Sequence, residues 1–227
     1  MSDEGVQNII DESDDKTYKK PVGTVFPTFF VGIGGCGSGI VQNIRKFVTS
    51  RPDYEQRYKK LVHFMAFDTD QDDLKDLDFT GFLISDFPKG QYVNIKMGKE
   101  YKEADPFFQQ WWPDWYASRP DSTKGAGQIR VESRLSLYYQ LDQDRSQIIS
   151  EINDKILQSK DHDNPFRSVR PPAAYVHIFC SLAGGTGSGG LMTIGYLFRE
   201  LLKSARLIPV IVANAVLPTL FYRKVRP

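Results

Sequence analysis

The feature that most constrains this chain is a glycine-rich run towards its carboxyl-terminal end, residues 184–190, with the sequence GGTGSGG. Before it, residues 174–182 form an apolar run with β-branched and aromatic side chains, which predicts a buried strand. After it, apolar residues recur at helical spacing between positions 194 and 205 and predict a helix. A glycine loop between a strand and a helix directs backbone N–H groups and a helix N-terminus at an anion. We therefore expect a phosphate-binding loop, to which Thr186 and Ser188 add hydroxyl groups. The alternative is a flexible glycine turn, and the absence of a following Lys distinguishes the run from the P-loop.

A second unit of the same kind lies near the start of the chain. Residues 25–31 predict a strand, and residues 40–48 predict a helix that ends before Arg51-Pro52. The sequence between them, GIGGCGSG at residues 32–39, is again rich in glycine. It also satisfies the GxGxxG fingerprint of dinucleotide-binding proteins, so an NAD-binding Rossmann oxidoreductase is an alternative interpretation.

Acidic residues follow the next predicted strand. Residues 61–67 are apolar and predict this strand, and Asp68-Thr69-Asp70 comes directly after it. In a parallel α/β sheet, the carboxyl ends of the strands face the ligand, and acids placed there can hold Mg²⁺ or bond a ribose hydroxyl. The alternative is that Thr69 or Asp70 caps a short helix that continues through Leu74 and Leu77, and both interpretations can hold together.

The middle of the chain is less regular. Residues 79–97 predict one or two short strands, and residues 98–124 form a long insertion that contains Trp111, Trp112 and Trp115. We expect these aromatic side chains to pack the insertion against the domain. The alternative is a contact with a protein partner, because Trp is favoured at interfaces.

Two further elements complete the expected fold. Residues 131–157 show apolar residues at helical spacing and predict one long helix. Residues 207–217 are apolar and β-branched and predict a last buried strand.

Composition sets bounds on the class of protein. The chain has 227 residues, 41% of them hydrophobic, which is enough for one α/β domain. A net charge of +1 argues against nucleic acid as a partner, and no run of eighteen apolar residues predicts a transmembrane segment. Residues 1–22 are polar and acidic and predict a disordered arm, which leaves residues 23–227 as the domain. Only two cysteines, Cys36 and Cys180, are present, which suits a reducing cytoplasm. We expect both thiols to be buried and unreactive, the alternative being thiols beside a bound nucleotide that shields them.

From about Val25 onward, the chain resembles the tubulin/FtsZ superfamily of GTPases. The resemblance rests on four segments: the glycine loop at residues 32–39, Phe67-Asp68-Thr69-Asp70, Gly125-Ala126-Gly127, and residues 184–189, which resemble the family's signature loop. The resemblance implies an α/β fold with a three-layer, Rossmann-like parallel sheet, of which this sequence covers the front half to two-thirds. It also implies GTP or GDP with Mg²⁺ as cofactors, and head-to-tail self-association into filaments or a larger complex.

The resemblance assigns roles to individual positions. The residues it places at the nucleotide phosphates are Gly34, Gly35, Cys36, Gly37, Gly125, Ala126, Gly127, Gly184, Gly185, Thr186, Gly187 and Ser188. Those it places at Mg²⁺ and the terminal phosphate are Asp68, Thr69 and Asp70, and those in the ribose region are Pro218, Tyr222 and Arg226.

The sequence also departs from the family pattern. Gly39 stands where the bacterial division protein has an Asn that packs on the nucleotide, and Tyr222 stands where that protein has a Glu. The sequence given stops before the family's central helix, which reads the guanine, and before the acidic loop that a neighbouring subunit's nucleotide needs for hydrolysis. We therefore expect weak hydrolysis by this chain alone, and a non-catalytic nucleotide-binding scaffold is a further alternative. A ubiquitin-activating-type fold is disfavoured because no CxxC zinc pair is present.

Overall fold

The computed structural model describes residues 24–86, 106–113, 125–142, 146–161, 163–167 and 172–220. The expected arm at 1–22, most of the insertion at 98–124, Trp115, Tyr222 and Arg226 lie outside these ranges.

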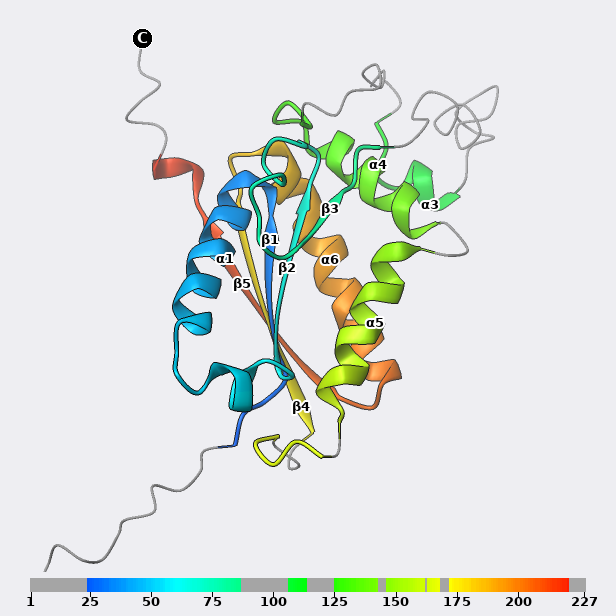
Figure 1. The fold of residues 1–227 in the computed structure, drawn as a ribbon. Helices are drawn as coiled ribbons and strands as arrows, with labels where there is room; N and C mark the ends of the chain where they lie inside the picture. The colour runs from blue at the N-terminus through cyan, green and yellow to red at the C-terminus, as the bar shows by residue number, and fades with distance from the viewer. Residues whose placement is uncertain are drawn as a thin grey trace, which may run out of the picture.

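A five-stranded parallel sheet forms the centre of the domain, in the order β3-β2-β1-β4-β5. Its strands are β1 (Thr28–Ile33), β2 (Val62–Asp68), β3 (Thr80–Leu83), β4 (Ala173–Ser181) and β5 (Ile208–Val216). The helices are α1 (Gly34–Thr49), α3 (Pro106–Gln109), α4 (Arg130–Leu141), α5 (Gln147–Ser159) and α6 (Gly185–Ser204), with a π-helical turn η3 (Tyr54–Tyr58) and a 3₁₀ turn η5 (Pro218–Leu220). Helix α1 covers one face of the sheet, and α4, α5 and α6 lie on the other (Figure 1). The predicted three-layer α/β architecture with a parallel sheet is therefore confirmed.

Strand β1 lies in the middle because its side chains are apolar on both faces. Phe29 and Ile33 pack into the main core, together with Phe198 of α6. On the opposite face, Phe30 packs into a smaller core with Val41 of α1. In parallel register, Ile33 pairs with Phe67 of β2 and with Cys180 of β4. The carboxyl ends of these three strands therefore lie side by side.

Three expectations about the elements need correction. The single helix predicted at 131–157 is two helices, because α4 ends at Leu141 and Ser146 caps the start of α5 by accepting a hydrogen bond from the N–H of Ile149 at 3.5 Å. The short helix expected after Asp70 is a series of turns over residues 71–76.

The third correction concerns β5, which forms as expected but is not buried. Among the described residues it pairs only with β4, and Ile208 and Val212 are exposed.

None of the described helices has the length and apolar character needed to cross a membrane.

Candidate functional site

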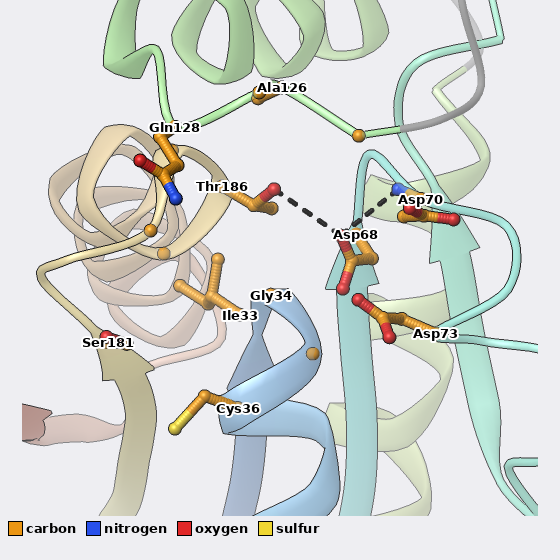
Figure 2. Close-up of a pocket in the computed structure, with 16 residues that line it drawn as sticks. Ile33, Gly34, Cys36, Asp68, Asp70, Asp73, Ala126, Gln128, Ser181 and Thr186 are labelled. Carbon is orange, nitrogen blue, oxygen red and sulfur yellow. Dashed lines mark hydrogen bonds between the residues drawn. The ribbon is translucent and has the colours of Figure 1, made fainter. Parts of the chain in front are cut away.

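A cavity of about 270 Å³ opens at the carboxyl ends of β1, β2 and β4 (Figure 2). Four separate segments enclose it: the start of α1, the turn after β2, the loop before α4, and the start of α6. The residues that line it are Ile33, Gly34, Gly35, Cys36, Asp68, Asp70, Asp73, Gly125, Ala126, Gly127, Gln128, Ser181, Gly184, Gly185, Thr186 and Gly187. The structure thus brings together lining residues that are up to 154 positions apart in the sequence, from Ile33 to Gly187.

The first glycine loop is tighter than its sequence alone indicates, because α1 already begins at Gly34. Gly34 has a φ of +76°, a conformation that favours glycine, and its backbone lies close to Gly187. Gly37 does not line the cavity, since a Cβ there would overlap the carbonyl oxygen of Phe179 in β4. Gly37 therefore serves the close approach of α1 to the sheet rather than the lining of the cavity.

In the signature loop, the glycines also differ from one another. Gly184 caps α6, lines the cavity, and would have open space around a Cβ. A Cβ on Gly185 would lie 2.7 Å from the backbone nitrogen of Ile129, so Gly185 is needed where two loops touch. Ser188 is outside the lining, and its hydroxyl donates to the carbonyl oxygen of Gly184.

Two threonines hold the turn after β2 against the signature loop. The hydroxyls of Thr69 and Thr186 lie 2.6 Å apart and are both buried. The Thr186 hydroxyl also donates to Oδ1 of Asp68 at 3.4 Å (Figure 2). The backbone N–H groups of Thr69 and Asp70 donate to the same oxygen, at 2.7 and 3.1 Å. Thr186 therefore both lines the cavity and positions the acidic turn.

Asp68 is buried, with 1% of its surface exposed. Burial raises the pKa of its carboxyl group to about 7, and the negative charge of Asp73 adds to this rise, while the N–H groups of Asp70 and Thr69 act in the opposite direction. The second oxygen, Oδ2, is buried and has no hydrogen-bond partner among the described residues. A buried carboxylate oxygen without a partner is costly, so this atom is suited to a ligand.

Asp73 is a cavity residue that the sequence did not single out. It lies in the segment expected to be helical, where the turns at 71–76 instead bring its carboxyl group back towards the start of α1. A Cβ on Gly35 would overlap this carboxyl group, so the glycine leaves the space that Asp73 uses. The only sequence signal was the acidic content of the turn itself.

The loop before α4 closes the cavity from the side opposite the strands. The N–H of Gly125 donates to the carbonyl oxygen of Thr69 at 3.1 Å, and the N–H of Ala126 donates to the Thr69 hydroxyl at 2.8 Å. Positive φ values at Gly125, Gly127 and Gln128 give the loop its sharp path. Gln128 lines the cavity and was not anticipated, although it directly follows the predicted Gly-Ala-Gly segment.

Among the remaining predicted residues, Pro218 and Cys180 lie outside the cavity lining, and Cys36 belongs to it. Pro218 starts the η5 turn after β5 and is not a lining residue. Cys36 is exposed and lines the cavity, so the expectation of a buried thiol is wrong there, whereas Cys180 is buried as expected. Burial raises the pKa of the Cys180 thiol.

The part of the insertion that the structure describes packs against α4. Trp112 is buried, and the ring of Trp111 lies edge-on to Tyr138 with centroids 5.7 Å apart. The guanidinium of Arg134 stacks over Trp111 at 4.9 Å. These contacts support the packing interpretation of the insertion, and the partner interpretation has no support from them.

The residues of the cavity fit a hydrated divalent cation. In the described part of the chain, no group of three or more His, Cys, Asp or Glu side chains forms a ready-made metal site. Mg²⁺, however, commonly keeps several waters and uses one or two carboxylates plus phosphate oxygens. The unpartnered Oδ2 of Asp68 provides such a carboxylate oxygen at the cavity.

Comparison with known proteins identifies the family. Residues 29–226 match the family model described as "Tubulin like". A search of curated proteins gave no match. Among solved structures, the chain is similar to CetZ2 from Haloferax volcanii in a GTPγS-bound protofilament, with 13% identity, a TM-score of 0.46, and coverage of 83% of this chain and 39% of that chain. It is also similar to an empty FtsZ dimer from M. jannaschii, with 14% identity, a TM-score of 0.43, and coverage of 84% and 36%.

A third similar structure is CetZ from Methanosaeta thermophila, with 21% identity, a TM-score of 0.42, and coverage of 86% of this chain and 37% of that chain. The chain spans 36% to 39% of the length of these three structures. Because the family model matches nearly the whole of the described region, this chain belongs to the tubulin-like family.

Proposed function

We propose that this chain binds a guanine nucleotide in the cavity at the carboxyl ends of β1, β2 and β4. The observation that carries the proposal is the convergence of two helix N-termini, those of α1 and α6, on one cavity. Each helix starts with glycines, so its first N–H groups are accessible to an anion and its dipole favours a negative charge. Two such termini facing one space suit a chain of phosphates.

The proposed division of roles follows the lining of the cavity. Gly34, Gly35 and Cys36 at the start of α1, and residues 184–187 at the start of α6, offer backbone N–H groups to the phosphates. The loop at 125–127 closes over them. Asp68 and Asp70 hold Mg²⁺, either directly or through water, and Thr69 connects them to the loop.

The choice of guanine rests on membership of the tubulin-like family. We propose that the chain also shares the head-to-tail self-association of that family and works as part of a GTPase assembly. The cytoplasm is its proposed location, because Cys36 and Cys180 are both free thiols and a reducing compartment keeps them so.

Nucleotide binding is tested best by Gly184→Val. A side chain at Gly184 meets open space within the fold but stands at the cavity, so the variant should fold and lose affinity for GTP by about 100-fold or more, because the added methyl groups keep phosphate oxygens from the backbone. The matched control is Gly195→Ala on the same helix, whose Cβ makes only an ordinary contact, 3.8 Å from Ile178.

Titration calorimetry with GTP, GDP and ATP in the presence of Mg²⁺ measures the affinities. The proposal expects the wild-type chain and Gly195→Ala to bind GTP and GDP with similar affinity, and Gly184→Val to bind both much more weakly. Equal GTP affinity in wild type and Gly184→Val, or no guanine nucleotide binding by the wild type, contradicts it.

A further inference from the structure

The carboxyl group of Asp73 occupies an unusual position for a site that accepts phosphates. It lies against Gly35, in the first turn of α1, where a Cβ would overlap it. A helix N-terminus attracts anions, so Asp73 stands where a phosphate oxygen would also be stabilised. Asp73 is outside the Asp-Thr-Asp segment on which the family resemblance rests, and its role has to be derived from the structure.

Asp68 faces Asp73 across the cavity. Figure 2 shows the two carboxyl groups turned towards each other, with the free oxygen of Asp68 on the side of Asp73. This oxygen, Oδ2, is buried and accepts no hydrogen bond from any described residue, whereas Oδ1 accepts several. Two carboxylates that face one another repel unless a cation or a proton lies between them.

The net charge of the residues that line the cavity also favours a cation in this space. The described lining residues include three carboxylates, Asp68, Asp70 and Asp73, and no Lys, Arg or His. A nucleoside triphosphate brings several further negative charges into the cavity. At the effective dielectric of such a site, which is lower than that of water, each close pair of like charges is unfavourable.

We propose that Asp68 and Asp73 hold a divalent cation between them before any nucleotide arrives, and that a polyphosphate enters the cavity only together with that cation. Asp73 thereby becomes a specificity-determining residue, since it excludes anions that come without a metal. Mg²⁺ commonly keeps several waters and binds proteins through one or two carboxylates, so Asp68 and Asp73 can supply the protein ligands of such a site. The first half of this inference concerns the nucleotide-free chain, and the second half rests on the proposed nucleotide binding.

Cation binding is measured on the nucleotide-free chain, with Mn²⁺ as the probe and electron paramagnetic resonance to count free metal. The wild-type chain should bind Mn²⁺ saturably. Asp73→Asn should weaken this binding by about 10-fold or more, because ligand charge sets affinity in carboxylate sites.

The matched control is Asp72→Asn, which removes the same charge from the same turn. The Asp72 side chain is exposed, pairs with Lys75 at 3.0 Å, and does not line the cavity, so Mn²⁺ affinity should stay within about 2-fold of wild type. A second variant, Gly35→Ala, leaves all charges in place but pushes the Asp73 carboxyl group aside, and it should also weaken Mn²⁺ binding. No saturable Mn²⁺ binding by the wild type, or equal affinity in Asp73→Asn and Asp72→Asn, overturns the inference.

A second arm compares GTP affinity in Mg²⁺ and in EDTA. The wild-type chain should lose about 100-fold in EDTA, and Asp73→Asn should lose clearly less, because the carboxylate that repels the metal-free nucleotide is gone. Equal GTP affinity of the wild type in Mg²⁺ and EDTA overturns the coupling while leaving the proposed function intact. Absence of GTP binding with Mn²⁺ binding preserved refutes the proposed function and leaves the cation site standing.

Discussion

Gly37 and Gly184 belong to similar-looking glycine runs, and the structure gives them different tasks. Gly37 allows α1 to contact the carbonyl of Phe179, whereas Gly184 leaves open space at the cavity. Ser188 and Thr186 differ in the same way, because the first hydroxyl returns to its own loop and the second reaches the acidic turn. A residue type in a motif therefore predicts that the position is special, and the neighbouring backbone decides why.

Asp68 should make the stability of the chain depend on pH. Its pKa is about 7 in the folded state and near 3.8 when unfolded, so the folded state binds more protons between these values. The free energy of unfolding should therefore fall as the pH rises from about 4 to 7, by roughly a few kcal/mol, because one pKa unit is worth ~1.4 kcal/mol. Urea denaturation in EDTA at several pH values measures this.

The comparison for that experiment is Asp68→Asn, which removes the titrating group. The variant should lack the fall in the free energy of unfolding that the titration of Asp68 causes. Its stability relative to the wild-type chain should therefore increase as the pH rises to 7. A wild-type curve that runs parallel to that of the variant over this range would show that Asp68 is not protonated preferentially in the folded state.

The two thiols should react differently with a thiol reagent. Cys36 is exposed at the cavity and should be labelled rapidly in the native chain, whereas Cys180 is buried and its pKa is raised. Labelling followed by mass spectrometry, with and without GTP and Mg²⁺, checks this. Bound nucleotide should slow the reaction of Cys36, and unchanged labelling of Cys36 would place the nucleotide elsewhere.

At the level of elements, small residues on α6 let α4 pack closely against it. A Cβ on Gly189 would overlap the carbonyl oxygen of Arg130 and lie 3.0 Å from Cβ of Ser133. The Ser133 hydroxyl also donates to the carbonyl oxygen of Thr186 at 3.0 Å, so this helix contact continues into the signature loop. A shift of α4 away from α6 would therefore also disturb the signature loop at the cavity.

Gly189→Ala should therefore destabilise the chain by about 2 kcal/mol, since the backbone of α4 cannot move aside without disturbing the core. Gly195→Ala, on the same helix but with space for its Cβ, should be neutral or stabilising by up to about 1 kcal/mol through helix propensity. Chemical denaturation of both variants gives the comparison. Equal stability of the two would mean that α4 is free to shift away from α6.

At the level of the whole molecule, the loops that meet at the cavity all lie at the carboxyl ends of the parallel strands. Among the described residues, β5 forms one edge of the sheet, and its residues Ile208 and Val212 are exposed. Under the proposed function, the cavity carboxylates of Asp68, Asp70 and Asp73 organise a cation rather than activate water. The family resemblance implies that hydrolysis needs an acidic loop from a neighbouring subunit, and no segment between Met1 and Pro227 resembles that loop.

Hydrolysis of GTP by this chain alone should accordingly stay near the uncatalysed background at every protein concentration. Release of phosphate, measured across a range of protein concentrations with Mg²⁺, tests this. Longer chains that carry the acidic loop should instead show turnover that rises more than linearly with concentration, since heterologous head-to-tail contacts build open assemblies. Turnover at ordinary enzyme rates that does not depend on concentration would place the catalytic group inside residues 1–227.

Much of the fold could be predicted from the sequence because its signals are local. Apolar runs predicted the strands at β1, β2, β4 and β5, and they predicted a helix after each glycine run, although α1 and α6 begin within those runs, at Gly34 and Gly185. The same local signals named the Asp-Thr-Asp turn and the signature loop, and the family resemblance named the Gly-Ala-Gly loop. The structure brings lining residues of all three to one cavity. A parallel sheet with β1 in its centre makes that convergence unavoidable, because neighbouring parallel strands end at the same edge.

Other features arose only from the tertiary structure. The break between α4 and α5, the exposure of β5 and the turns at 71–76 override local helical or apolar patterns. The cavity positions of Asp73 and Gln128, and the tasks of Gly37 and Gly185, depend on which backbone lies opposite. Sequence periodicity reports which face of an element is apolar, but it carries no information on the contacts between distant segments. Those contacts set the free oxygen of Asp68 beside Asp73, and with it the electrostatics of the site.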